Sequence, residues 1–462
     1  MTSVDPDGRD AVIILPGIMG SELVEAATGR TLWGLADVGW YVQAWTSGRS
    51  LDRLMVTDEE RSGHCDRVVA RRLLQFPAFA PGLRGFEPYT AIATRARQVA
   101  AHPDAVLEFP YDWRLSVEHS AEMLSRAADR HLTRWRAHPA GHPDAKLLLV
   151  AHSMGGLVAG YFTEVLGWSS SVRALVTLGT PFYGSVKAAH LLSTGRGAPL
   201  PMPRRRLRTL AGSLPGLYDL LPSYRCVDER TSARKLTASD VVAIGGDGEL
   251  ATESFVRRER LLGAGGISGS AVLRPVVGVD QETMQSLILA DGVITTHPYT
   301  LTPGPGPDGG VGREDRGGDG TVYREAASPP GSDPLHLPQT HGALAARVEG
   351  IAHVCAQITA REKGPWLAGV RHLGLAVPDM VAVADSFDIR VTGCDDPAAV
   401  VCRVTDAASG RAVAQPLPGR DGDGLRARTR VTRPGLYRVE VKTGGLSAVT
   451  DLVLAVPLGD LT

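Results

Sequence analysis

The sequence predicts an α/β fold, in which a parallel sheet presents a serine, followed by a small antiparallel β-sandwich. Three observations predict this. The apolar run 146–151 turns abruptly into a helical pattern around Ser153. Short apolar runs alternate with helical segments over residues 10–360, as in parallel sheets. Beyond the linker-like segment 362–365 the pattern changes to short runs separated by turn residues, which is typical of a sandwich.

The composition bounds the class of protein. A chain of 462 residues holds one large or two ordinary domains, and its hydrophobic (43%) and charged (21%) shares are those of a soluble globular protein. A net charge of −1 gives no support for nucleic-acid binding. Five scattered cysteines without metal-ligand spacing predict reduced thiols and no metal or cofactor. No signal peptide or membrane-spanning run is visible, so we expect a cytoplasmic protein, or one peripheral at a membrane.

The first predicted strand, residues 10–15, ends in a glycine-rich loop, Pro16-Gly-Ile-Met-Gly-Ser21. A loop at this place can supply a backbone N–H to an oxyanion, with Ile18 as the first candidate and Gly17 as the second. The alternative is a plain glycine turn. Residues 31–50 then gather Trp33, Trp40 and Trp45, which favours packing in the core or under a lid, with peripheral contact to a membrane as the alternative.

The next segments continue the alternation of helices and strands. Helical patterns over residues 89–101 and 118–136 flank a strand at 105–109. The strand ends in Pro110-Tyr-Asp-Trp-Arg114, where we expect Asp112 and Arg114 to form a structural ion pair.

Ser153 lies where the strand 146–151 meets its helix. A nucleophilic serine on a strained strand-to-helix turn needs small neighbours two residues to either side, and here these are Ala151 and Gly155. The N–H of Met154 would point into the same pocket. The alternative is an ordinary turn in which the serine caps the helix.

A strand at 172–178 precedes a long insertion, residues 186–270, which we interpret as a cap or lid. Residues 271–279 and 287–294 predict either a strand pair or a strand and a hairpin. A helical pattern at 343–361 closes this region.

A serine nucleophile needs a base and a group that orients the base, in the chain order serine, acid, histidine. Ser153, Asp319 and His341 satisfy this order, and a histidine is a suitable base near neutral pH. The rival acid is Asp247. The rival bases are His336 and His353, whereas His152 is expected to be structural.

We predict a domain boundary at residue 362, with a hydrolase-type domain over 1–362 and the sandwich over 363–462. Strand-like runs at 386–391, 400–405, 425–431, 435–441 and 450–456 predict an immunoglobulin-like arrangement. Asp421-Gly-Asp-Gly424 is interpreted as a turn, because it lacks further calcium ligands.

Five motifs together resemble the lecithin:cholesterol acyltransferase family, which includes lysosomal phospholipases and bacterial members. They are residues 15–21, 110–114, 151–155, Gly179-Thr-Pro-Phe-Tyr-Gly-Ser185 and Gly318-Asp-Gly-Thr-Val322. The resemblance covers residues 10–360. It implies an α/β-hydrolase fold, acyl-enzyme chemistry at Ser153 with Asp319 and His341, and an oxyanion hole at Ile18 and Met154. Unlike the exported, disulfide-bonded animal members, this chain has no visible signal and no obvious bridges.

The expected function is therefore hydrolysis or transfer of the acyl group of a lipid ester, of phospholipid type. One alternative is an esterase, lactonase or thioesterase acting on a soluble substrate. Another is a non-catalytic hydrolase-like scaffold. The sandwich is expected to bind a protein partner or to place the enzyme.

Overall fold

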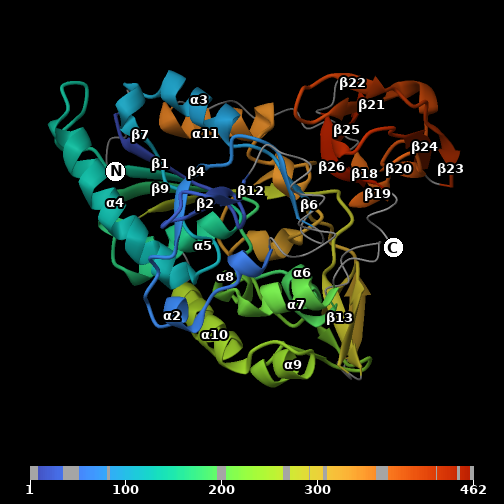
Figure 1. Cartoon of the computed structure of the whole chain (residues 1–462), viewed down its shortest axis with the longest axis horizontal. Coiled ribbons are helices and arrows are strands. Elements are labelled where there is room, and N and C mark those ends of the chain that lie inside the picture. The colour runs from blue at the N-terminus through green and yellow to red at the C-terminus, as the bar shows by residue number, and fades with distance from the viewer. Residues whose placement is uncertain are drawn as a thin grey trace.

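The computed structural model describes residues 9–34, 51–80, 84–194, 204–263, 271–290, 292–304, 310–360, 373–422, 424–444 and 448–457. Figure 1 shows a mixed body of helices and strands, with a group of strands from the C-terminal region packed against one side of it.

A six-stranded parallel sheet forms the centre of this body, in the order β17-β12-β9-β8-β1-β7. Its strands β1, β8 and β9 are almost entirely buried because helices cover both faces of the sheet, which explains their continuous apolar runs. This is the predicted α/β-hydrolase fold. The strands are β1 (Ala11–Leu15), β7 (Val106–Glu108), β8 (Leu147–His152), β9 (Val172–Leu178), β12 (Val272–Gly278) and β17 (Leu335–Leu337).

Helices α3 (Thr90–Val99) and α11 (Val348–Ile358) pack together on one face of the sheet, and α4 (Val117–Ala137) and α5 (Met154–Gly160) on the other (Figure 1). Both predicted helices before the serine are confirmed. The last one begins five residues later than predicted, because residues 341–343 form a separate helical turn, η7 (His341–Ala343).

The insertion between β9 and β12 contains most of a cap. Its elements are α6 (Val186–Thr194), α7 (Arg204–Ser213), α8 (Pro215–Tyr218), β10 (Val227–Asp228), β11 (Ala233–Arg234), α9 (Ala238–Ala243) and α10 (Gly248–Leu262). Residues 287–294 form a hairpin, β13 (Ser286–Ala290) and β14 (Val293–His297), which joins the cap in a sheet of order β11-β10-β13-β14. Of the two arrangements predicted after residue 270, the strand and hairpin is therefore confirmed.

Smaller elements surround the sheet. They are β2 (Ser21–Glu25), β3 (Thr31–Trp33), β4 (Val68–Leu73), β5 (Ala78–Ala80), β6 (Arg84–Phe86), α2 (Asp58–Arg61), β15 (Thr300–Pro303) and β16 (Val311–Glu314).

The C-terminal region is a two-sheet sandwich. One sheet has the order β18-β20-β24-β23, and the other has the order β19-β26-β25-β21-β22. The first strand is split between the sheets: β18 pairs antiparallel with β20, whereas β19 runs parallel to β26. The hydroxyl of Tyr437 donates to the carbonyl of Arg433 (2.8 Å), as in the tyrosine corner of immunoglobulin domains. The immunoglobulin-like prediction is confirmed, with the exception that one strand pair is parallel. The strands are β18 (Gly374–Ala376), β19 (Met380–Ala382), β20 (Ser386–Thr392), β21 (Val400–Asp406), β22 (Ala412–Ala414), β23 (Gly419–Asp421), β24 (Gly424–Arg430), β25 (Gly435–Thr443) and β26 (Val449–Val456).

The sandwich shares a hydrophobic core with the hydrolase body. Leu436, Leu452 and Leu454 belong to the same buried cluster as the central sheet, while a second cluster fills the space between the two sheets of the sandwich. The predicted domain boundary at residue 362 lies outside the described residues and stays a prediction.

The expectation of membrane contact around Trp33 needs correction. Trp33 is fully buried, donates its indole N–H to the carbonyl of Met19 (2.7 Å) and packs edge-on against Trp113. Its side chain therefore belongs to the core. Trp40 and Trp45 lie outside the described residues. Within the described chain, no helix combines the length and the apolar character needed to cross a membrane. All five cysteines are free thiols.

Candidate active site

The turn at Ser153 has the geometry of a nucleophile elbow. Ser153 has a φ of 51° and a ψ of −126°, between β8 and α5. This is a strained conformation for a residue other than glycine. A Cβ on Gly155 would lie 2.3 Å from the carbonyl oxygen of Pro16, so only glycine fits there. The alternative reading as a helix cap is wrong, because the side chain of Ser153 makes no capping hydrogen bond.

The structure brings Ser153, His341 and Asp319 together. The Nε2 atom of His341 lies 2.8 Å from the Oγ of Ser153, and its Nδ1 lies 2.7 Å from the Oδ2 of Asp319. The two loops are also joined directly, because the N–H of His341 donates to the carbonyl of Asp319 (2.8 Å). Beneath the imidazole, Gly179 has a φ of 63°, and a Cβ there would lie 3.0 Å from both the carboxylate and the ring.

The carboxylate of Asp319 is held from its other side. Its Oδ1 accepts the N–H groups of Thr321 (2.9 Å) and Val322 (2.7 Å), and the residue is 2% exposed. These bonds fix which oxygen faces the imidazole. His341 must then present an N–H at Nδ1 and a free lone pair at Nε2 toward the serine.

The rival residues have other places in the fold. Asp247 caps α10, accepting the N–H groups of Glu249 and Leu250, and pairs with Arg61. His336 lies at an exposed position of β17, and His353 lies within α11. In the described residues no hydrogen bond joins any of these three to Ser153.

The backbone N–H groups of Ile18 and Met154 are the predicted donors of an oxyanion hole, with Gly17 as the alternative to Ile18. The N–H of Gly17 donates to the hydroxyl of Tyr89 (2.9 Å), so it is occupied. Ile18 lines the cavity beside Ser153, and Met154 is the first residue of α5, where backbone N–H groups have no partner within the helix. This geometry favours Ile18 over Gly17 as the donor that would act together with Met154.

His152 is structural, as predicted, and links three segments. Its Nδ1 lies 2.7 Å from the hydroxyl of Tyr89, and its Nε2 lies 3.0 Å from the carbonyl of His341. Since a carbonyl oxygen can only accept, Nε2 of the imidazole must carry the proton, and Nδ1 accepts the hydroxyl of Tyr89. Burial, and then the nearby His341, lower the pKa of His152 to about 3. The neutral ring thus holds the loop of Gly17 and the loop of His341 against β8.

This buried imidazole predicts that the fold is sensitive to acid. An unfolded histidine binds a proton near pH 6.5, whereas folded His152 binds one only near pH 3. The stability due to the neutral ring is therefore complete above about pH 6.5 and is lost as the pH falls toward 3. We expect the difference in unfolding free energy between the wild type and His152→Gln to shrink steadily from pH 7 to pH 4, measured by urea unfolding. The exposed His64 supplies the control, since His64→Gln should give a small difference at every pH. A difference for His152→Gln that stays constant with pH would contradict the assignment.

A cavity of about 30 Å³ adjoins Ser153 and His341, and its walls include the cap residues Leu217 and Leu220. The sequence analysis did not single out Lys187, which also lines this cavity and is 7% exposed. Its ammonium lies 3.3 Å from the Oγ1 of Thr321, beside the loop of Asp319. One signal was present in the sequence: Lys187 is one of only five lysines, and it lies two residues after the end of the motif 179–185.

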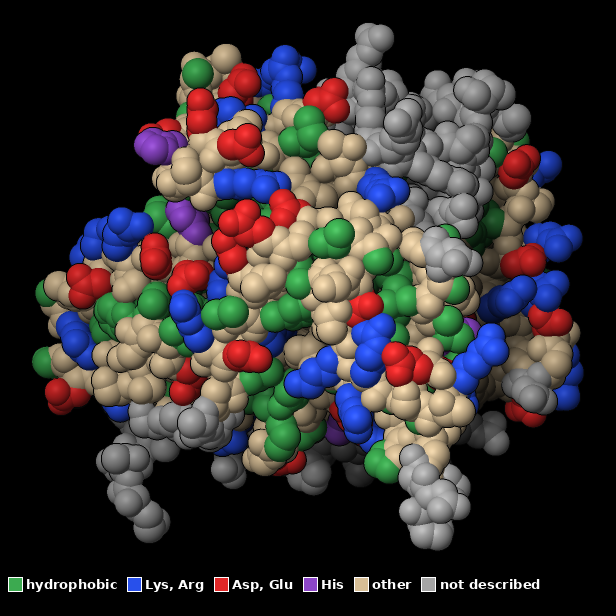
Figure 2. Space-filling view, turned by 90° about the horizontal axis from the view of Figure 1, so that it is seen from below, with side chains coloured by type: hydrophobic (Ala, Val, Ile, Leu, Met, Phe, Trp, Pro, Cys, Tyr) green, Lys and Arg blue, Asp and Glu red, His purple; other side chains and the backbone are tan. Residues whose placement is uncertain are grey.

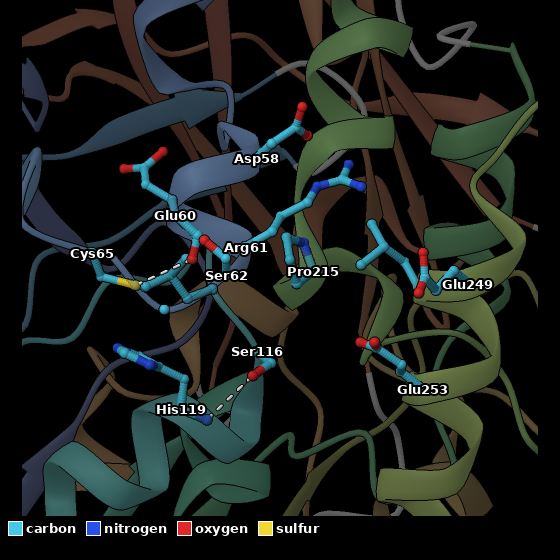
Figure 3. Close-up of a pocket in the computed structure, with 13 residues that line it drawn as sticks. Asp58, Glu60, Arg61, Ser62, Cys65, Ser116, His119, Pro215, Glu249 and Glu253 are labelled. Carbon is cyan, nitrogen blue, oxygen red and sulfur yellow. Dashed lines mark hydrogen bonds between the residues drawn. The ribbon is translucent and has the colours of Figure 1, made fainter.

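A larger, separate cavity of about 360 Å³ lies between α2, α8, α10 and the start of α4. Figure 3 shows Asp58 and Arg61 on one side of it and Glu249 and Glu253 on the other. Ser116 accepts the N–H of His119 at its edge. No member of the Ser153 site lines this cavity, so it is not part of the candidate active site.

Among the described residues, only His102, Asp104 and His138 group as potential metal ligands. The Nδ1 of His102 accepts the N–H of Asp104, and the Nδ1 of His138 accepts that of Ala140. Each neutral ring therefore keeps its proton on Nε2, where a metal would have to bind. The group does not fit a metal site.

The parallel sheet with its covering helices and the elbow at Ser153 give the class of fold: the protein has the α/β-hydrolase fold. In particular, residues 83–256 match the model of the lecithin:cholesterol acyltransferase family, described as "Lecithin:cholesterol acyltransferase". The resemblance is thus confirmed over this segment, which includes Ser153, and it supports an acyl ester hydrolase or acyltransferase.

Comparisons with individual proteins give more distant likenesses. No curated protein matches the sequence significantly. A chain of the Tle4–Tli4 complex shares 17% identity at a TM-score of 0.47, over 76% of this chain and 96% of that one. The Bacillus licheniformis lipase BlEst2 in its propeptide form shares 10% sequence identity at a TM-score of 0.34, and the match covers 98% of this chain and 94% of that one. The M1 domain of titin shares 12% sequence identity at a TM-score of 0.15, and the match covers 20% of this chain and 97% of that one. Likenesses this distant carry no argument about substrate.

Proposed function

We propose that the protein cleaves acyl esters of lipids through a covalent acyl-enzyme at Ser153 and passes the acyl group to water or to an alcohol. One observation carries the proposal: an unbroken path of hydrogen bonds from Ser153 through His341 to Asp319, at 2.8 Å and 2.7 Å. A serine hydroxyl is a poor nucleophile without such a base.

In the proposed reaction, Nε2 of His341 takes the proton of Ser153 as its Oγ attacks the ester carbonyl. Asp319 stays ionised and stabilises the imidazolium. The N–H groups of Ile18 and Met154 hold the oxyanion. The imidazolium then protonates the leaving alcohol, and a water or acceptor alcohol, deprotonated by the same imidazole, releases the acyl group.

A phospholipid-type substrate is supported by Lys187. A nearly buried ammonium in the wall of the cavity beside the nucleophile can pair with a phosphate or another anionic group next to the ester. A soluble ester, lactone or thioester remains the second candidate, supported by the small volume of the cavity, about 30 Å³.

We predict that Lys187→Met raises KM for a phosphate-bearing lipid ester about tenfold or more, because hydrogen bonds to charged groups contribute about 1.5–3 kcal/mol. KM for a neutral ester with the same acyl chain should change less than about twofold. Lys146→Met, at an exposed position on the opposite end of β8, is the matched control. An equal loss on both substrates would assign Lys187 a purely structural role.

The test of the proposed function is labelling with a fluorophosphonate probe. We expect the probe to modify Ser153, and Ser153→Ala to abolish both labelling and ester turnover. Turnover that survives in Ser153→Ala would overturn the proposal, and no turnover by the wild type would favour the non-catalytic scaffold. Incubation with a mixed lipid extract, followed by identification of consumed and new species, distinguishes hydrolysis from transfer.

The cytoplasmic location, peripheral membrane contact through the lid and a protein partner of the sandwich stay predictions.

A further inference from the structure

The loop that carries His341 is bound to the C-terminal sandwich. Gln339, 2% exposed, donates from its amide to the carbonyl of Ala448 (2.8 Å) and accepts the N–H of Thr450 (3.3 Å). The hydroxyl of Thr340 donates to the carbonyl of Thr450 (2.6 Å). The two residues that precede the imidazole are therefore held by the main chain at the start of β26.

The loop that carries Asp319 is held in the same way by β18. Gln281, also 2% exposed, donates to the carbonyl of Leu373 (3.1 Å) and accepts the N–H of Leu375 (3.0 Å). Its own N–H donates to the carbonyl of Gly318 (2.9 Å), directly before Asp319. Each buried amide pairs with the main chain of the sandwich as a neighbouring strand would.

The interface around these contacts is tight. A Cβ on Gly85, in β6, would lie 2.3 Å from the Cβ of Leu452 in β26, so the two strands cross at a distance that only glycine permits. Nearby, Arg438 of β25 makes two hydrogen bonds of 2.6 Å to the buried carboxylate of Glu87. If the sandwich were detached, these buried polar groups would lose their partners.

We propose that the sandwich is part of the catalytic apparatus, with Gln339, Thr340 and Gln281 as positioning residues that hold His341 and Asp319 against Ser153. The inference rests on the proposed function. It assigns the sandwich a role in the reaction, in addition to any partner it binds. Because misplacing reacting groups by about 1 Å can cost on the order of 10² in rate, two loops that must bring a base and its orienting acid to one serine benefit from a common rigid support.

The test uses the full chain, since removing a region that shares the core would unfold the rest. We expect Gln339→Met and Thr340→Val to lower kcat by about tenfold or more at nearly unchanged KM, and to shift the pH profile of kcat. Thr340→Ser, which keeps the hydroxyl, should restore kcat to within about twofold of the wild type.

Thr163→Val is the matched control. Thr163 is also buried and its hydroxyl also donates to a backbone carbonyl, that of Ala159 (2.8 Å), but it is distant in sequence from both loops. It should leave kcat unchanged well below the unfolding temperature, whatever its effect on stability. Full kcat and an unchanged pH profile in both Gln339→Met and Thr340→Val would overturn the inference while leaving Ser153-dependent turnover intact. Absence of Ser153-dependent turnover in the wild type would instead overturn the proposed function, and this inference with it.

Discussion

Asp319→Asn is expected to lower kcat by roughly 10⁴-fold, the loss that the same change causes in the chymotrypsin-type triad. The structure gives a specific reason. Oδ1 of Asp319 accepts two backbone N–H groups, from Thr321 and Val322, so an asparagine must keep its carbonyl there and turn its NH₂ toward His341. The imidazole would then accept at Nδ1 and carry its proton on Nε2, where it cannot take the proton of Ser153. Single-turnover and steady-state assays on an ester that the wild type cleaves measure this.

The matched control is Asp247→Asn, at the rival acid that the sequence offered. Asparagine caps a helix about as well as aspartate, so Asp247→Asn loses mainly the partly exposed ion pair with Arg61. It should cost no more than about 1 kcal/mol of stability and leave kcat nearly unchanged. The reverse outcome, with activity lost in Asp247→Asn and kept in Asp319→Asn, would overturn the assignment of the acid.

Arg114→Met is expected to destabilise the fold by about 3–5 kcal/mol, the second large effect. Arg114 is fully buried and pairs with both Asp112 (2.7 Å) and Glu60 (2.7 Å). Removing the guanidinium leaves two largely buried carboxylates without this partner, and methionine fills the volume without replacing the charge. Urea unfolding followed by circular dichroism at pH 7 measures the change.

A surface pair provides the control for Arg114→Met. Arg97 and Glu108 form an ion pair of 2.6 Å in which both side chains are more than a quarter exposed. Arg97→Met should cost no more than about 1 kcal/mol. If both substitutions cost the same, the buried pairing of Arg114 contributes no more than a surface one.

The sequence predicted the sheet, the elbow and the three residues that the structure brings together at Ser153, because each depends on a local pattern or on its place along the chain. A buried apolar run that ends just before Ser153 indicates the strand and the turn directly. Asp319 and His341 were chosen by chain order and by their place on the loops before the last helical pattern. The five longest strands of the sandwich were predicted for the same reason, whereas short strands such as β18 and β19 carry too few residues to show a period.

What could not be predicted depends on contacts between distant segments. Nothing local marks Gln339 or Gln281 as bound to strands more than 90 residues away. Trp33 was weighed as a membrane contact because composition shows that an aromatic is present, not which surface covers it. Lys187 was overlooked because one lysine after a motif is unremarkable until the fold places it beside Ser153.

The cap sheet has a consequence for engineering this chain. Its strand β10 comes before β12 of the central sheet, whereas its partners β13 and β14 come after it. The polypeptide therefore leaves the cap, forms β12 of the central sheet and then returns to the cap as the hairpin β13–β14. Deleting the insertion as one block would strip the returning hairpin of its neighbour, so a lidless version must replace both pieces together.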